Sequence, residues 1–198
     1  MILKRHCGLK KRGRQIFKYR PLVCVLIVIS LSSMVWAQSH QPYAGQESRD
    51  IKALSPAEIE DYLSGNGMGL AKAAELNHYP GPKHVIDLAD ELQLTADQRA
   101  KSQAVYDAMR QEAAELGRRI VNAERYLDRL FASQSITEAT LQEHIHKIAA
   151  SQGQLRLVHL KAHLAQRIVL TPQQVAHYNT LRGYDHNGQH DHHHQHRD

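Results

Sequence analysis

The stretch LTADQRAKSQAVYDAMRQEAAELGRRIVNAERYLDRLF, residues 94–131, decides the fold of this chain. It contains no proline, and its first glycine is Gly117. Thr95 and Gln98 have the spacing of a capping box, in which each side chain bonds the other residue's backbone amide. The sequence predicts one unbroken helix to Phe131, about 55 Å long at 1.5 Å per residue. Its apolar residues recur at the spacing of one buried stripe, at Val105, Met109, Leu116, Ile120, Ala123, Leu127 and Leu130.

The next part of the chain predicts a second long helix. Residues 132–136 indicate a turn, and either Ser135 or Thr137 is placed to cap the helix that follows. No segment alternates β-branched and polar residues, so we expect an all-α fold built on an elongated antiparallel helical hairpin with short flanking helices. Two apolar stripes lie on either side of Gly153: Leu141, Ile145 and Ile148, then Leu157, Leu160, Leu164 and Ile168.

The capping signal of the first long helix occurs a second time. Leu170-Thr171-Pro172-Gln173-Gln174 has the Thr and Gln of a capping box, with proline at the first helical position. A last helix is expected from there to about Arg182, where Gly183 ends it. We expect the recurring residues to act by capping and packing alone: Leu94, Thr95, Gln98, Leu170, Thr171 and Gln174.

Short helices are expected before the hairpin. Ser55-Pro56-Ala57-Glu58 is a further capping box and predicts a helix of about two turns. The stretches 65–69 and 77–82 contain the glycines and prolines that separate it from short helices over 70–76 and 83–92. The domain organisation we predict is a flexible linker over 38–54, a helical domain over 55–184 and a disordered His-rich tail over 185–198.

The first 37 residues differ from the rest of the chain. They hold eight basic residues, no acidic ones, both cysteines and the only tryptophan. The basic stretch precedes an apolar run over residues 22–37 that ends in Val-Trp-Ala. The run is shorter than the roughly 20 residues of a membrane span, and it is typical of a signal peptide cleaved before Gln38. The alternative is an uncleaved signal anchor, and no lipobox surrounds Cys24.

Removal of this segment changes the sign of the charge. The whole chain has a formal net charge of +5, whereas residues 38–198 have 17 basic against 20 acidic residues, a net charge of −3. Without the leader, nothing favours a nucleic-acid partner. The remainder has no cysteine, which excludes disulfides, thiolate metal sites and cysteine catalysis. We expect a periplasmic protein that has no membrane contact after processing.

With its two Leu-Thr-x-x-Gln motifs, at 94–98 and 170–174, the chain resembles the Spy/CpxP family of periplasmic helical proteins, whose signature is a repeated LTxxQ. It also resembles the related heavy-metal-resistance proteins, the ZraP- and CnrR-like sensors. The resemblance covers residues 80–184. It implies a thin, curved, antiparallel helical dimer with a hooked or cradle-like form. Some members hold unfolding clients without ATP, and others bind metal ions and report envelope stress.

Histidine is frequent, with 14 residues in 38–198. Neutral imidazole binds Zn²⁺, Ni²⁺ and Cu²⁺, whereas Cu⁺ prefers soft sulfur ligands that are scarce here. His159 and His163 lie one helical turn apart and form a weaker second site that needs a third ligand from elsewhere. No metal is expected to be required for folding. The main metal-collecting element is predicted in the tail, at His186, His190, Asp191, His192, His193, His194 and His196.

Two functions fit these observations. The first is a periplasmic stress-response protein of Spy/CpxP type, an ATP-independent chaperone or adaptor with metal-binding capacity. The alternative is a heavy-metal sensor or buffer for Zn, Ni or Cu(II) in metal resistance. No enzyme is expected, because G-x-S-x-G, H-E-x-x-H, P-loop and dinucleotide motifs are absent. Expected partners are a second copy, since a two-helix hairpin cannot bury both faces alone, and unfolded periplasmic proteins or a sensor protein.

Overall fold

The structure, a computed structural model, describes residues 42–184. The chain divides into two units at Ala44, and every helix described lies in the unit that starts at Gly45. No strand occurs in the described part, so the all-α prediction is confirmed there. The predicted signal peptide and the His-rich tail lie outside the described residues. The helices are α2 (Pro56–Ser64), α3 (Lys72–Glu75), α4 (Pro82–Asp87), α5 (Ala96–Ala132), α6 (Glu138–Val169) and α7 (Pro172–Leu181).

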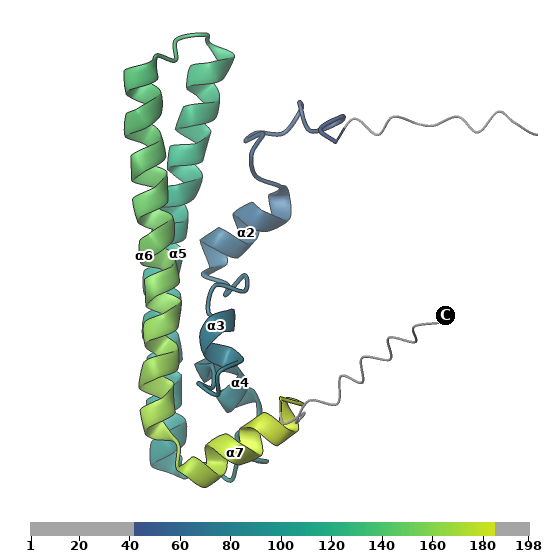
Figure 1. Cartoon of the computed structure of the whole chain (residues 1–198), viewed down its shortest axis with the longest axis vertical. Coiled ribbons are helices and arrows are strands. Elements are labelled where there is room, and N and C mark those ends of the chain that lie inside the picture. Colours follow the sequence, from purple (N-terminus) through teal and green to yellow (C-terminus); the bar gives the residue numbers. More distant parts are fainter. Residues whose placement is uncertain (1–41, 185–198) are drawn as a thin grey trace, which may run out of the picture. The chain divides into compact units, whose positions relative to one another are not determined.

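Helices α5 and α6 form the predicted antiparallel hairpin, and Figure 1 shows them side by side along their length. The connecting turn ends at Thr137, whose side chain accepts a hydrogen bond from the backbone N–H of Thr140. Thr137, and not Ser135, is therefore the cap of α6. Figure 1 shows α2, α3 and α4 following one another along one side of the hairpin, while α7 turns across its base.

The hairpin has a small apolar core near its middle. Ala113, Leu116 and Ile120 of α5 pack against Leu155 and Val158 of α6, and all five are buried. Tyr62 of α2 packs against this cluster. Because the cluster consists of one layer between two helices, its contribution depends on every member being well packed.

A close approach between α2 and α5 positions the short helices. Gly117 lies in the middle of α5, and a Cβ atom there would overlap the backbone carbonyl of Tyr62. At Gly65, which ends α2 with a positive φ of 68°, a Cβ atom would lie 2.6 Å from the carbonyl oxygen of Arg110. Both glycines are therefore required for α2 to contact the backbone of α5 directly.

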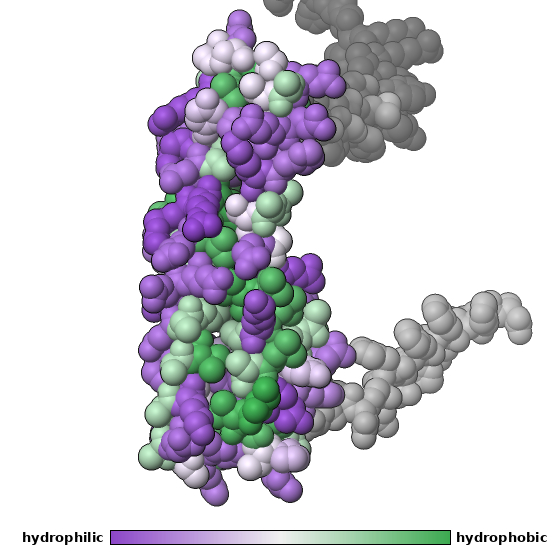
Figure 2. Space-filling model, turned by 90° about the vertical axis from the view of Figure 1, so that its left-hand side faces the viewer, coloured by the Kyte–Doolittle hydropathy of each residue, from purple (hydrophilic) through white to green (hydrophobic). Residues whose placement is uncertain are grey.

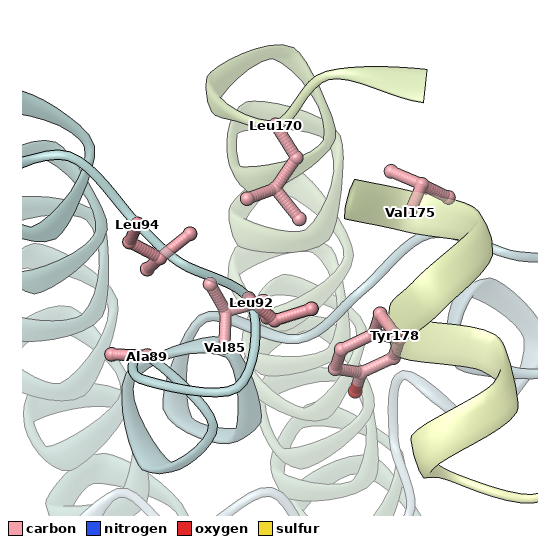
Figure 3. Packing of buried hydrophobic residues seen from close by; sticks show 7 residues of the cluster. All are labelled: Val85, Ala89, Leu92, Leu94, Leu170, Val175 and Tyr178. Atoms are coloured by element: carbon pink, nitrogen blue, oxygen red, sulfur yellow. The ribbon is translucent and has the colours of Figure 1, made fainter. Parts of the chain in front are cut away.

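The base of the hairpin carries a second core, shown in Figure 3. Leu94 and Leu170, the first residues of the two repeated motifs, both point into it. The chain between α4 and α5 also contributes, because α4 ends at Asp87 instead of continuing to Leu92 as expected. Turns over residues 88–94 then bring Leu92 and Leu94 into the same cluster. Its buried members are Val85, Ala89, Leu92, Leu94, Leu170, Val175 and Tyr178.

The segment before α2 is packed, in contrast to the flexible linker that we expected up to Leu54. Ile51 and Leu54 are buried together with Val121 of α5. Two ion pairs to α5 flank this contact, from Lys52 to Asp128 and from Asp50 to Arg125. The linker expectation is wrong at this end because two apolar residues in a polar stretch are sufficient to dock it on the hairpin.

We predict that Gly117→Ala separates α2 from α5. The added methyl group has no space beside the carbonyl of Tyr62, and such overpacking typically costs about 1–3 kcal/mol. Urea unfolding should show the loss, and hydrogen exchange should increase in α2. Gly153→Ala is the matched control, because a Cβ atom there meets nothing within 4 Å, and it should leave stability unchanged or raise it by up to about 1 kcal/mol. Equal behaviour of the two variants would contradict the packing role of Gly117.

Candidate functional site

The glutamines of the two repeated motifs bond to each other. Gln98 Nε2 donates to Gln174 Oε1 at 2.8 Å, and Gln174 Nε2 donates to Gln98 Oε1 at 3.1 Å. Each amide also donates to a backbone carbonyl, that of Val169 for Gln98 and that of Leu92 for Gln174. This reciprocal pair joins the first turn of α5 to the first turn of α7.

The same glutamines complete the two capping boxes. The backbone N–H of Thr95 donates to Gln98 Oε1, and that of Thr171 donates to Gln174 Oε1. In return, the hydroxyl groups of both threonines accept from the backbone N–H of their glutamine. All donors of each side-chain amide are thus used, and the motif residues act in capping and packing as expected.

Glu75, on the short helix α3, is the centre of a polar junction beside this base. Its side chain is largely buried and accepts hydrogen bonds from the Tyr178 hydroxyl at 2.5 Å and the Tyr184 hydroxyl at 3.1 Å. The backbone N–H of Gly81 donates to its second oxygen at 3.0 Å. Arg182 Nε lies 3.6 Å from the carboxylate and balances its charge. Burial, and then the bond to Glu75, raises the pKa of the Tyr178 hydroxyl, which therefore remains a donor.

His159 and His163 lie on the face of α6 that is turned toward this junction. Nδ1 of His163 is 2.7 Å from the carbonyl oxygen of Tyr79, and because a carbonyl can only accept, this nitrogen carries a proton and donates it. The side chain of His159 is only 3 % exposed, and its Nε2 has no hydrogen-bond partner among the described residues. Burial, and then the neighbouring His163, lowers the pKa of His159, which keeps the ring neutral.

A cavity of about 480 Å³ lies beside the two histidines. The loop of residues 65–69, α3 and the start of α4 enclose it together with α5 and α6. This size is within the range of small-molecule sites in proteins. The i, i+4 histidine pair was singled out from the sequence as a weak metal site and residues 65–69 only as a break between helices, so neither the cavity nor the contribution of Glu75 was foreseen.

The metal sites predicted from the sequence have different outcomes. The tail histidines and Asp191 lie outside the described residues. His159 and His163 are brought together as predicted, but no group of three or more His, Cys, Asp or Glu side chains suited to a metal ion occurs within residues 42–184. The carboxylate nearest to the pair belongs to Glu75, and its two oxygens already accept three hydrogen bonds. The described part of the chain therefore supplies two ligands and not a complete site.

The outer face of α6 carries the apolar stripe that the sequence placed after Gly153. Leu157 is 42 % exposed, Leu164 54 % and Ile168 85 %. Figure 2 shows apolar surface on this side of the hairpin, which faces away from α2, α3 and α4. The face toward α3 and α5 buries three polar residues beside three apolar ones, and the buried residues from position 155 onward are Leu155, Val158, His159, Ala162, His163 and Gln166.

Comparison with known proteins gave no matching family model, no matching curated protein and no matching solved structure. Among the described residues, none of the helices combines the length and apolar character that crossing a membrane requires.

We predict that Gln98→Ala destabilises the base of the hairpin by about 2–3 kcal/mol, because it removes the partner of the backbone N–H of Thr95, of the Val169 carbonyl and of one N–H of the Gln174 amide. Urea unfolding followed by circular dichroism measures the change. Gln103→Ala is the control on the same helix, since Gln103 bonds only an exposed Asp107, and it should cost less than about 0.5 kcal/mol. The bridging role of Gln98 is wrong if both variants are equally stable.

We also predict that His159 makes stability fall in acid. Its pKa is lowered in the folded state, so above the ordinary value of 6.5 both states are neutral. As the pH falls below 6.5, the unfolded chain takes up a proton that the folded chain does not, and the free energy of unfolding decreases. His159→Leu should therefore show a smaller loss between pH 7.5 and pH 5 than the parent protein. His146→Leu, at an exposed position of α6, should keep the full loss. A full loss in His159→Leu as well would show that His159 is not its source.

Proposed function

We propose that this protein is an ATP-independent holding chaperone of Spy/CpxP type, which binds unfolding polypeptide segments on the outer face of α6. The observation that carries this proposal is the exposure of Leu157, Leu164 and Ile168 on a helix that buries histidine and glutamine instead. These three residues are spaced by seven and four, so they lie on one face of the helix. Exposed apolar patches of this kind mark interaction sites.

The charges beside the stripe favour acidic clients. Beyond Glu143, α6 has four basic residues and no acidic ones: Lys147, Arg156, Lys161 and Arg167. Lys161 is exposed and lies between Leu157 and Leu164 on the same face. A segment that presents both apolar and acidic side chains can therefore satisfy both parts of this face, and long-range attraction accelerates the encounter.

The strength expected of such a face suits a chaperone without an energy source. Full burial of a Leu or Ile side chain is worth about 1.5–3 kcal/mol, and the three residues of the stripe are only partly exposed. A total of about 4 kcal/mol corresponds to a dissociation constant near 1 mM, and each further 1.4 kcal/mol tightens it tenfold. Contacts of this strength hold a client for a short time and release it without ATP hydrolysis. A second copy of the chain would present a second stripe and raise the effective affinity.

The resemblance in the two LTxxQ motifs supports the same proposal, together with the expected export to the periplasm. It also supports a homodimer, in which part of the exposed apolar surface is covered by the second copy.

We predict that Leu164→Asp combined with Ile168→Asp abolishes suppression of client aggregation while helical content remains. Both side chains are at least half exposed, so the substitutions should cost little stability. Light scattering of a reduced or heated model client, without ATP and with a fivefold excess of chaperone, measures the activity. Leu63→Asp on α2 is the control, because Leu63 is 40 % exposed but lies away from α6. Unchanged suppression by the double variant would overturn the proposal.

A metal-buffering role is the second candidate, and we propose that it resides in the tail. Its basis is the run of six histidines in residues 186–196, since each ligand pair there can chelate Zn²⁺, Ni²⁺ or Cu²⁺ once its imidazoles are deprotonated. Isothermal titration of the full chain against a form ending at Tyr184, at pH 7.5 and pH 5, tests this role. Equal metal stoichiometry of the two forms would assign the binding elsewhere.

A further inference from the structure

We propose that the cavity beside α3 and α6 binds an amphipathic monocarboxylate, a molecule with one anionic head group and an apolar chain. This inference is independent of the chaperone proposal, because the cavity faces α3 and α4, whereas the stripe of Leu157, Leu164 and Ile168 lies on the outer face of α6.

The walls of the cavity suit an apolar chain. Ala71 and Leu76 contribute from the α3 region, Pro82 from the start of α4 and Met109 from α5. Met68 adds a second thioether side chain from the glycine-rich loop, where it has a positive φ of 43°. Methionine is flexible and polarizable, so it adapts to chains of differing shape.

One polar group of the wall has no hydrogen-bond partner among the described residues, and a carboxylate could supply one. His159 lines the cavity, is buried and has an Nε2 atom with no partner among the described residues. A buried polar atom without a hydrogen bond costs about 1–3 kcal/mol, and a bound acceptor would recover that cost. A neutral imidazole can carry its single proton on Nε2 and donate it to a carboxylate oxygen.

The charges around the cavity favour an anion. Lys72 and Lys83 line it, and Lys72 makes no ion pair with any described residue, while Lys83 pairs with Asp87. The acidic residue of the lining is Glu75, whose carboxylate is occupied by Tyr178, Tyr184, the amide of Gly81 and the guanidinium of Arg182. Within residues 42–184, the charge left without a partner in the lining is therefore the ammonium group of Lys72.

The same features argue against a metal cation as the ligand. Three imidazoles line the cavity, those of His84, His159 and His163. Zn²⁺ needs at least three ligands that converge on one point, and within residues 42–184 no group of three or more His, Cys, Asp or Glu side chains is suited to hold a metal ion. The lysines repel a divalent ion, and the cavity of about 480 Å³ is far larger than one ion needs. An organic anion uses both the volume and the charge.

Titration of the full-length protein with decanoate, below its micelle concentration, tests the proposal by calorimetry. We expect saturable binding of one decanoate per chain, at least tenfold tighter than binding of decanol, which has the same chain without the charge. His159→Leu should weaken decanoate binding at least tenfold, the value for loss of one hydrogen bond to a charged group. Lys72→Gln should weaken it severalfold. His146→Leu and Lys101→Gln, at exposed positions on α6 and α5, are the matched controls and should bind as the parent does.

Two further variants test where decanoate binds. Ala71→Phe, which fills the cavity, should abolish binding, and it keeps the test decisive if His159→Leu does not fold. The double variant at Leu164 and Ile168 should bind decanoate normally, which distinguishes the cavity from the chaperone face. Equal affinity for decanol and decanoate, or full affinity in both His159→Leu and Ala71→Phe, would overturn the proposal. Binding of Zn²⁺ that depends on His159, without any binding of decanoate, would overturn it as well.

Discussion

The reciprocal bond between the side-chain amides of Gln98 and Gln174 is the contact on which the base of this molecule depends. It aligns the starts of α5 and α7, so that the leucines preceding each motif enter one core. That core places Tyr178 of α7 where its hydroxyl reaches Glu75. Glu75 in turn accepts a hydrogen bond from the backbone N–H of Gly81. This bond fixes the start of α4, which lines the cavity beside the histidine pair. A substitution of either glutamine should therefore also disturb the core at the base, the bond between Tyr178 and Glu75, and the bond between Glu75 and Gly81.

Helix α6 has an unusual distribution of side chains, and this distribution connects structure to function. Its inner face accommodates His163 and Gln166 because the carbonyl of Tyr79 and Glu75 lie beside the histidine and Ser102 bonds the glutamine. His159 is buried on the same face with no partner for its Nε2 among the described residues. Leu157, Leu164 and Ile168 are on the outside of the same helix. Such an exchange lowers the stability of an isolated chain, since the apolar area stays in water. Under the function that we propose, an unfolding polypeptide would cover that area while it is bound.

The sequence predicted the helices well and the roles of their faces less well. Thr95, Thr171 and Ser55 cap helices as expected, because capping depends on residues within three positions of one another. The direction of the stripe at Leu157 and Leu164 was not predictable from spacing, since Leu155, Val158 and Ala162 form an alternative stripe on the same helix. Burial of Ile51 in an otherwise polar segment, and convergence of five groups on Glu75, depend on contacts between residues far apart in the chain.

The apolar support of the hairpin does not extend to its turn. Three apolar clusters support the hairpin. On α5 their members extend no further toward the turn than Val121, and on α6 no further than Leu155. Beyond these positions, Ile148 is the buried apolar side chain that the two helices share toward their turn. The hairpin is thus held from its base past its middle, and the part next to the turn has the least support. Bending and helix fraying should start at the turn around Gln134 and diminish toward the base, so the outer part of the hairpin should be its most compliant part.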